Sequence, residues 1–339
     1  MKVGLTYNQK RDDAAEAAEL PCSAEIQAEW DTPETIAAVI TALEERHEVI
    51  PLEASDGVYQ ALQRARPDIV FNIAEGTFGP CREGHVPSIL EYLNIPYTAS
   101  DPLTLNMCLD KSRAKEVLAY HHLPTARFRV VSERMFSFNS LHYPMLVKPL
   151  YEGSSIGIRN DSLVHSRQEM RDKVHWVLDR FREPALVEEF LPGREFTVAI
   201  LGNGEQARVL PIVEIKFDSL PPGVNPIYSY EAKWVWDQSE NPLEIFECPA
   251  RLSQELHDQI EKICLSAYRL LRCRDWCRVD VRLDAAGQPH IIELNPLPGI
   301  LPRPEDNSCF PKAARAAGLD YHKLINTVLD IACRRYGLI

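Results

Sequence analysis

Two carboxylates, Asp280 and Glu293, lie in a segment whose pattern predicts a β-hairpin. Residues 278–284 alternate polar and apolar side chains, as a half-buried strand does, and a second strand-like run covers 289–295. A turn closed by Ala286-Gly287 would place the two carboxylates directly opposite each other, with Cβ atoms about 4.5–5.5 Å apart. The hairpin therefore predicts a pair of acidic groups on one face of a sheet.

A bound cation would explain this acidic pair, because two carboxylates so close together repel each other. Oxygen ligands at this spacing suit Mg²⁺, which takes one or two carboxylates and completes its shell with phosphate oxygens and water. The same register places Arg278 opposite Asn295. Two alternatives stay open: a surface hairpin whose acids pair with arginines, and a turn with an odd residue count, which would separate the carboxylates onto opposite faces.

A lysine at the end of an apolar strand precedes a loop rich in glycine and serine. Lys148 comes near the end of the run 143–149, and the loop Glu152-Gly153-Ser154-Ser155-Ile156-Gly157 follows. Glycine allows close backbone approach, and successive N–H groups can hold a phosphate. The loop is not a Walker A motif, because no Gly-Lys-Ser/Thr opens a helix. An ordinary hairpin connection is the alternative.

Two further segments carry groups suited to a nucleotide. Glu188 and Glu189 interrupt the apolar strand 185–191, where acids are disfavoured, and could accept hydrogen bonds from the amino or hydroxyl groups of a nucleotide. Lys233 lies in a proline-rich stretch, 218–242, whose length is typical of lids and binding loops. The alternatives are an edge strand with solvated acids and a packed surface loop.

These segments are complementary in charge. Lys148, Lys233 and Arg278 need an anion, whereas Asp280 and Glu293 need a cation. ATP with bound Mg²⁺ satisfies both demands, and no Ser-His-Asp order or cysteine nucleophile stands out. The four segments together therefore predict a site for ATP and Mg²⁺.

The composition is that of a folded protein with an acidic surface. The 339 residues are 45% hydrophobic and 25% charged, with a net charge of −12. This charge argues against nucleic acid or a membrane surface as a partner, and no apolar run reaches the roughly 18–20 residues of a membrane span. The first ten residues have no signal-peptide pattern, and nine dispersed cysteines suggest reduced thiols, so we expect a cytoplasmic protein.

Short apolar strands alternate with helical stretches, which predicts an α/β fold. Three domains are expected: an open-sheet domain over 1–110, a central domain with the glycine loop over 111–192, and a C-terminal domain with the lid and metal site over 193–339. Strands are expected at 2–7, 47–51, 67–73, 143–149 and 185–191, and helices at 111–120, 166–181 and 322–335. Thr32-Pro33-Glu34 is a typical helix start.

The order of these motifs resembles the ATP-grasp superfamily and, within it, the D-alanine–D-alanine ligase family. The resemblance is nearly full-length and rests on Asn94–Ser100, Leu109–Lys111, Val147–Pro149, Glu152–Gly157, Glu188–Glu195, Tyr230–Lys233, Arg278–Asp280 and Glu293–Gly299. It implies three α/β domains with ATP between the central and C-terminal ones. It also implies a cytoplasmic homodimer that converts a carboxylate to an acyl phosphate and then to an amide with an amino acid.

The resemblance assigns roles to individual residues. The nucleotide contacts it implies are Lys111, Lys148, Ser155, Glu188, Glu189, Leu191, Glu195 and Lys233. The metal ligands, for Mg²⁺ or Mn²⁺, are Asp280, Glu293 and Asn295. The catalytic groups are Arg278 and the backbone N–H near Gly299 for the oxyanion, Ser154 of the glycine loop, and Lys233 near the transferred phosphate.

The substrate pockets depart from the family pattern. The family's Gly-Gly-x-Ser-x-Glu stretch, whose glutamate holds the first amino acid's ammonium, has no counterpart in residues 6–10. Trp234 stands where a tyrosine follows the lid lysine, and Tyr228, Tyr230 and Ser308 are the other candidate substrate contacts. Three functions therefore stay open: ligation of two D-alanines, ligation of other substrates including a donor without an α-amino group, and ATP-binding regulation without turnover.

Overall fold

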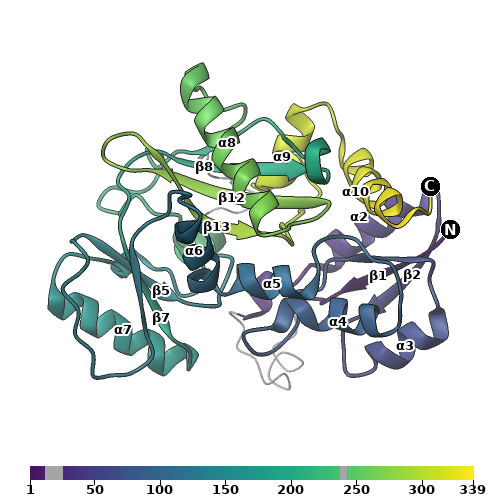
Figure 1. Ribbon diagram of the computed structural model, residues 1–339, viewed down its shortest axis with the longest axis horizontal. Helices are drawn as coiled ribbons and strands as arrows, with labels where there is room; N and C mark the ends of the chain where they lie inside the picture. The colour runs from purple at the N-terminus through teal and green to yellow at the C-terminus, as the bar shows by residue number, and fades with distance from the viewer. Residues whose placement is uncertain (12–25, 237–242, 244) are drawn as a thin grey trace.

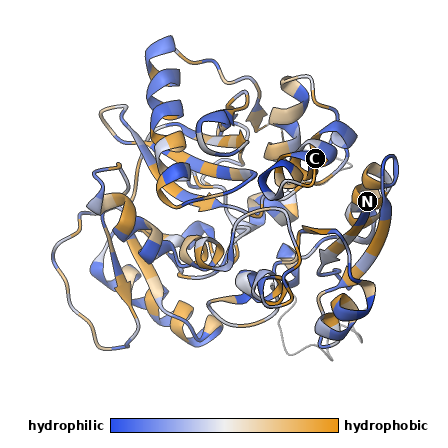
Figure 2. Ribbon diagram, turned by 45° about the vertical axis from the view of Figure 1, so that its right-hand side comes forward, coloured by the Kyte–Doolittle hydropathy of each residue, from blue (hydrophilic) through white to orange (hydrophobic). Residues whose placement is uncertain are grey.

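The computed structural model describes residues 1–11, 26–236, 243 and 245–339, and its strands form three sheets that follow one another along the chain (Figure 1). The expected α/β fold is confirmed. Hydrophobic residues are concentrated on the strands, as Figure 2 shows. None of the described helices is both long and apolar enough to cross a membrane.

The N-terminal sheet is parallel, with strand order β2-β1-β3, as an open α/β sheet requires. The predicted helix start is confirmed, because the Thr32 hydroxyl accepts a hydrogen bond from the Thr35 amide and Pro33 takes the first helical position. The elements of this unit are β1 (Lys2–Tyr7), η1 (Ile26–Glu29), α2 (Pro33–Glu44), β2 (Glu48–Glu53), α3 (Val58–Ala65) and β3 (Ile69–Asn72).

A run of short helices leads to the second sheet. It comprises η2 (Arg82–Gly84), α4 (His85–Tyr92), α5 (Pro102–Leu109) and α6 (Lys111–Tyr120). The predicted bounds of α6 are confirmed, because Asp110 accepts hydrogen bonds from the Ser112 and Arg113 amides and so fixes the helix start. Lys111 and Lys115, four residues apart, consequently share one buried face of α6.

The second sheet is antiparallel, with order β4-β7-β5-β6. Its elements are β4 (Phe128–Val131), β5 (Met145–Pro149), η3 (Asn160–Ser162), β6 (Leu163–Val164), α7 (Arg167–Phe181) and β7 (Ala185–Glu189). The side chains of α7 pack on this sheet around Val174 and Val177. Pairing of β5 with β7 brings Lys148 and Glu188, near the ends of their strands, to the same region.

The third sheet has six strands and carries most of the predicted metal and catalytic residues. Its order is β11-β10-β8-β12-β13, with β9 paired to β8. The elements are β8 (Glu195–Leu201), η4 (Gly204–Gln206), β9 (Arg208–Val209), β10 (Val213–Ile215), η5 (Ala232–Trp236), β11 (Phe246–Glu247), α8 (Gln254–Leu270), β12 (Trp276–Leu283), β13 (Pro289–Asn295), α9 (Cys309–Ala316) and α10 (Tyr321–Tyr336).

The first and third sheets share a core. The ring of Trp276 lies between Phe71 of β3 and Phe310 of α9, with centroids 5.7 Å and 5.6 Å apart. This packing fixes the N-terminal sheet against the sheet that holds the predicted metal ligands. The boundaries at 110/111 and 192/193 stay predictions.

Candidate active site

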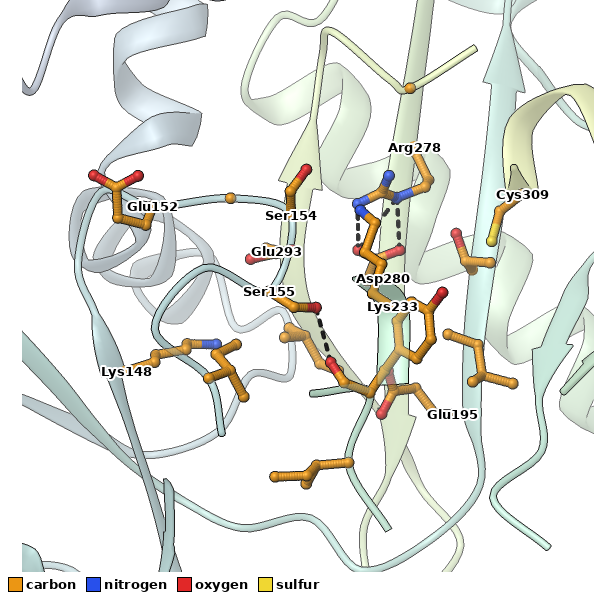
Figure 3. Close-up of a pocket in the computed structure, with 18 of the residues that line it drawn as sticks. Lys148, Glu152, Ser154, Ser155, Glu195, Lys233, Arg278, Asp280, Glu293 and Cys309 are labelled. Atoms are coloured by element: carbon orange, nitrogen blue, oxygen red, sulfur yellow. Dashed lines mark hydrogen bonds and ion pairs between the residues drawn. The ribbon is translucent and has the colours of Figure 1, made fainter. Parts of the chain in front are cut away.

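A cavity of about 240 Å³ is lined by all three parts of the chain (Figure 3). The predicted residues that line it are Lys111, Lys148, Ser154, Ser155, Glu188, Glu189, Leu191, Glu195, Tyr228, Lys233, Arg278, Asp280, Glu293, Gly299 and Ser308. Within the described residues, Tyr230 and Asn295 are not part of the lining. The side chain of Trp234 lies outside what the structure describes.

The hairpin of β12 and β13 pairs Asp280 with Glu293 and Arg278 with Asn295, as predicted. The Arg278 guanidinium binds Asp280 through two parallel contacts, Nε to Oδ1 and Nη2 to Oδ2, both 3.0 Å long. The Asn295 amide donates to Asp280 Oδ2 at 3.2 Å. Asn295 therefore lies beside the acidic pair although it does not line the cavity.

The predicted turn is wrong, although the pairing at the site is right. Instead of closing at Ala286-Gly287, the hairpin has a three-residue turn between Asp284 and Gln288, and its glycine has a φ of 78°. This odd turn shifts the register by one residue, but a β-bulge at Ile292 restores it before Asp280 is reached. The two irregularities cancel, so the carboxylates meet on one face.

The oxygen donors at this hairpin fit a hard divalent cation, because two carboxylates and a neighbouring amide oxygen are ligands that Mg²⁺ accepts. Burial alone would raise the pKa of Glu293, but Lys111, Lys148 and Arg278 outweigh it and lower the pKa. Lys111 Nζ lies 3.8 Å from Glu293 Oε2. Glu293 therefore stays ionised in a cationic surrounding.

Glu188 lies between two buried lysines. Lys148 Nζ is 2.7 Å from its Oε1, and Lys115 Nζ is 2.9 Å from its Oε2. Burial alone would raise the pKa of Glu188, but the two lysines lower it to about 2. The carboxylate is thus ionised and fixes Lys148 at the cavity, and its contact with a nucleotide base stays a prediction.

The glycine loop is held from the N-terminal part of the chain. The Gly153 amide donates to Glu29 Oε1 at 2.8 Å, and a Cβ at this position would lie only 2.4 Å from that oxygen. Arg82 binds the other Glu29 oxygen at 2.8 Å. Ser154 and Ser155 both have positive φ angles, 49° and 61°, which is uncommon outside glycine and concentrates at functional sites.

A lid segment, residues 216–236, borders the cavity and carries Lys233. Its Tyr228 carbonyl accepts a hydrogen bond from Ser155 Oγ at 2.8 Å. Residues 232–236 form a π-helix, η5, rather than the predicted loop. Burial, and secondarily the nearby guanidinium of Arg278, lower the pKa of Lys233 to about 8.

Glu195, predicted for the ribose, and Glu189, predicted as a further nucleotide contact, have different partners. Glu195 Oε2 binds Arg282 Nη1 at 2.6 Å. The Glu189 carboxylate instead accepts from the His142 amide at 2.9 Å and lies 3.4 Å from Arg127. A direct contact between the Glu189 side chain and a nucleotide therefore has less support than the contact predicted for Glu195.

Ser308 shapes the loop that follows β13. Its hydroxyl donates to the Gly299 carbonyl at 3.0 Å and accepts from the Leu301 amide at 3.2 Å. This loop and the start of α9 line the cavity together. The predicted contact of Ser308 with a substrate carboxylate stays a prediction.

The cavity is also lined by several charged side chains that were not predicted from the sequence, among them Glu29, Asp31, Lys115 and Arg282. Lys115 could have been predicted from the sequence, because it follows Lys111 by about one helical turn. Arg282 could also have been predicted, because it shares a strand face with Asp280. Glu29 and Asp31 could not have been predicted, because tertiary packing alone brings the segment before α2 to the glycine loop.

One family model and several known proteins are similar to this chain over most of its length. A family model described as D-ala D-ala ligase C-terminus matches residues 117–330. The chain is 35% identical over 316 residues to the uncharacterized protein y4sG of Sinorhizobium fredii, covering 91% of this chain and 90% of that protein. It is 37% identical over 278 residues to the D-alanine–D-alanine ligase of Bordetella avium, covering 81% of each chain.

Two further similarities extend over most of the chain. The D-alanine–D-alanine ligase of Pelotomaculum thermopropionicum is 31% identical over 313 residues, 89% of this chain and 92% of that protein. The crystal structure of a D-alanine–D-alanine ligase from Bacillus anthracis complexed with ATP superposes with a TM-score of 0.74 at 23% identity, covering 100% of this chain and 99% of that chain. The two chains share the same fold.

Proposed function

The chain belongs to the D-alanine–D-alanine ligase family of ATP-grasp, ATP-dependent ligases, and we propose that it joins an amino-bearing carboxylate to an amine through an acyl phosphate. One observation carries this proposal: Lys148, Lys233 and Arg278 surround the same cavity as the Asp280–Glu293 pair (Figure 3). Such a cavity is complementary to a nucleoside triphosphate with a divalent cation.

The first half-reaction uses the cationic side of the cavity. Lys111, Lys148 and Lys233 bind the phosphates of ATP and neutralise the γ-phosphate as the donor carboxylate attacks it, giving an acyl phosphate and ADP. Asp280, Glu293 and Asn295 would hold Mg²⁺ or Mn²⁺, which supplies Lewis-acid charge neutralisation at the phosphates when bound. Leu191 and Glu195 contact the base and ribose.

The second half-reaction needs a dry site. The lid segment and the Ser154–Ser155 loop exclude water, which would otherwise hydrolyse the acyl phosphate. The acceptor amine attacks the acyl carbon, and Arg278 and the Gly299 amide hold the oxyanion that forms. The bond to phosphate then breaks, which releases inorganic phosphate and leaves the amide. The three-domain division, a homodimer and a cytoplasmic location belong to the same proposal.

Two acidic side chains of the segment before α2, Glu29 and Asp31, line the cavity and favour a donor with a positively charged amino group. Asp31 lines the cavity, and its carboxylate has no hydrogen bond or ion pair with any described residue, whereas Glu29 is occupied by Arg82 and Gly153. Burial raises the pKa of Asp31 to about 7. A half-buried carboxylate without a counter-ion is stabilised by a cationic ligand, so Asp31 is the group that replaces the family's missing glutamate.

Replacing Asp31 by asparagine is expected to lower kcat/KM for the donor about 10- to 100-fold, mainly through KM, because the acceptor of the hydrogen bond from the ammonium loses its negative charge. Hydroxylamine in place of the acceptor traps the acyl phosphate as a hydroxamate and isolates the donor. Glu44→Gln, which removes an exposed charge from α2, is the matched control. An unchanged donor KM, or a best donor without an amino group, would contradict the assignment.

The function itself is tested by phosphate release from ATP and Mg²⁺ over a panel of carboxylates and amines. The panel contains both enantiomers of amino acids with neutral, acidic and basic side chains, their α-hydroxy analogues, and pairs of these compounds. We expect ADP, phosphate and an amide in equal amounts, identified by mass. Tight ATP binding without release for any pair would instead favour the regulator.

A further inference from the structure

Arg282 connects the carboxylate predicted for the ribose with the lid segment. On the basis of the proposed function, we propose that Arg282 is a positioning residue: it holds Glu195 toward the ribose hydroxyls of the nucleotide and ties the lid segment to that contact. Ribose recognition and the position of the lid would then depend on one side chain.

The first observation is the pairing of Arg282 with Glu195. They are direct cross-strand neighbours on β12 and β8, and Arg282 Nη1 donates to Glu195 Oε2 at 2.6 Å. Arg282 is only 5% exposed. The second carboxylate oxygen, Oε1, has no hydrogen-bond partner among the described residues, and Glu195 lines the cavity (Figure 3). One oxygen is therefore anchored while the other is available to accept from a ligand hydroxyl.

The second observation is the contact of Arg282 with the lid segment. Its Nη2 donates to the Pro226 carbonyl at 2.7 Å. Its guanidinium carbon lies 4.6 Å from the ring centre of Phe190 and 5.1 Å from that of Phe217, which stands at the start of the lid segment. The planar guanidinium is thus fixed by two aromatic rings and by hydrogen bonds in two directions.

The lid segment is also bound on the opposite side of the cavity. Asn225 donates two hydrogen bonds to Asn160, 2.7 Å and 2.8 Å long, and the Ser155 hydroxyl donates to the Tyr228 carbonyl. The lid segment therefore joins the second sheet to the third sheet. On the third sheet it is held by Arg282 and by the ring of Phe246 in β11, whose centre lies 5.6 Å from that of Tyr228. Loss of Arg282 would remove the hydrogen bond to the Pro226 carbonyl and weaken this attachment.

A purely structural ion pair is the competing explanation, and Arg194 provides a matched control for it. Arg194 forms a two-pronged ion pair with Glu214 in the same sheet, 2.7 Å and 2.6 Å long, and lies 5.0 Å from the ring centre of Phe196. It does not line the cavity. Arg194→Met removes the same kinds of contact and leaves the Arg282–Glu195 ion pair in place.

The experiment compares the binding of ADP, 2′-deoxy-ADP and 3′-deoxy-ADP by calorimetry in the presence of Mg²⁺. These probes need no knowledge of the amino-acid substrates. In the unmodified protein, loss of one ribose hydroxyl should weaken binding about 10-fold, because a charged acceptor loses its donor. Arg282→Met and Glu195→Gln should both reduce this discrimination to less than about threefold, whereas Arg194→Met should retain it.

Hydrogen–deuterium exchange of residues 225–233 gives a second readout. ADP should slow exchange there in the unmodified protein and in Arg194→Met, but much less in Arg282→Met. Arg282→Lys keeps the charge without the planar fork, so it should recover the folded state and only part of the discrimination. Full discrimination and full protection in Arg282→Met would overturn the proposal, as would an unmodified protein that binds all three nucleotides equally. Absence of ADP binding in the unmodified protein would overturn the proposed function itself.

Discussion

Replacing Asp280 by asparagine is expected to lower ATP turnover at least about 100-fold. Residues that only support a metal ligand cost up to about 100-fold when they are replaced, and a direct ligand should cost at least as much. Asparagine keeps the size and one acceptor oxygen, so the fold at β12 should persist. It removes the negative charge that faces Glu293 in the hairpin and that binds Arg278 through two contacts. The divalent cation and the guanidinium would thus both lose their shared partner.

Steady-state turnover measured against Mg²⁺ concentration distinguishes these two losses. A metal ligand is indicated if higher Mg²⁺, or Mn²⁺, restores part of the turnover. Asp284→Asn is the matched control, because Asp284 accepts hydrogen bonds from turn amides at the end of the same strand and its asparagine can do the same. Turnover in Asp280→Asn within threefold of the unmodified protein would refute the metal-site assignment.

The acidic pair was predictable because it depends on local periodicity, yet the reason it forms differs from the prediction. Alternation along 278–284 correctly placed the polar face. The turn has one residue too many for the predicted register, and the bulge at Ile292 compensates. A bulge depends on how β13 packs against its neighbours, including buried Leu294, which the sequence pattern of one hairpin does not specify.

Strand and helix positions were predicted well where caps and apolar runs are strong, as at Thr32 and Asp110. The charged side chains of the site were predicted where they lie on those elements. Their partners were not predicted, because contacts such as Gly153 with Glu29 join segments far apart in the chain. The same limit applies to Glu188, whose pairing with Lys115 depends on how α6 packs against the second sheet.

The regulator alternative and the ligase differ in what they require of Arg278. The residues predicted to bind ATP and its metal ion, such as Lys148, Glu293 and Glu195, line the cavity without any need for Arg278. Its Nε and Nη2 are used by Asp280, and its Nη1 has no partner among the described residues. A fixed guanidinium with an unused N–H group at this cavity is useful chiefly where negative charge develops during a reaction.

Replacing Arg278 by alanine is therefore expected to lower amide formation about 10²–10³-fold, the cost typical of removing one oxyanion donor, while ADP binding stays within about threefold. The loss should be larger in the second half-reaction, where the oxyanion forms, than in acyl-phosphate formation. Hydroxylamine trapping of the acyl phosphate and quantification of the amide measure the two steps separately.

Arg278→Lys separates charge from geometry. Lysine keeps the positive charge but cannot bind Asp280 through two parallel contacts while also reaching an oxyanion, so it should restore acyl-phosphate formation more than amide formation. An Arg278→Ala variant with both steps reduced equally would mean that Arg278 acts through Asp280 and the metal alone. A variant with neither step reduced would refute the assignment of Arg278 to the oxyanion.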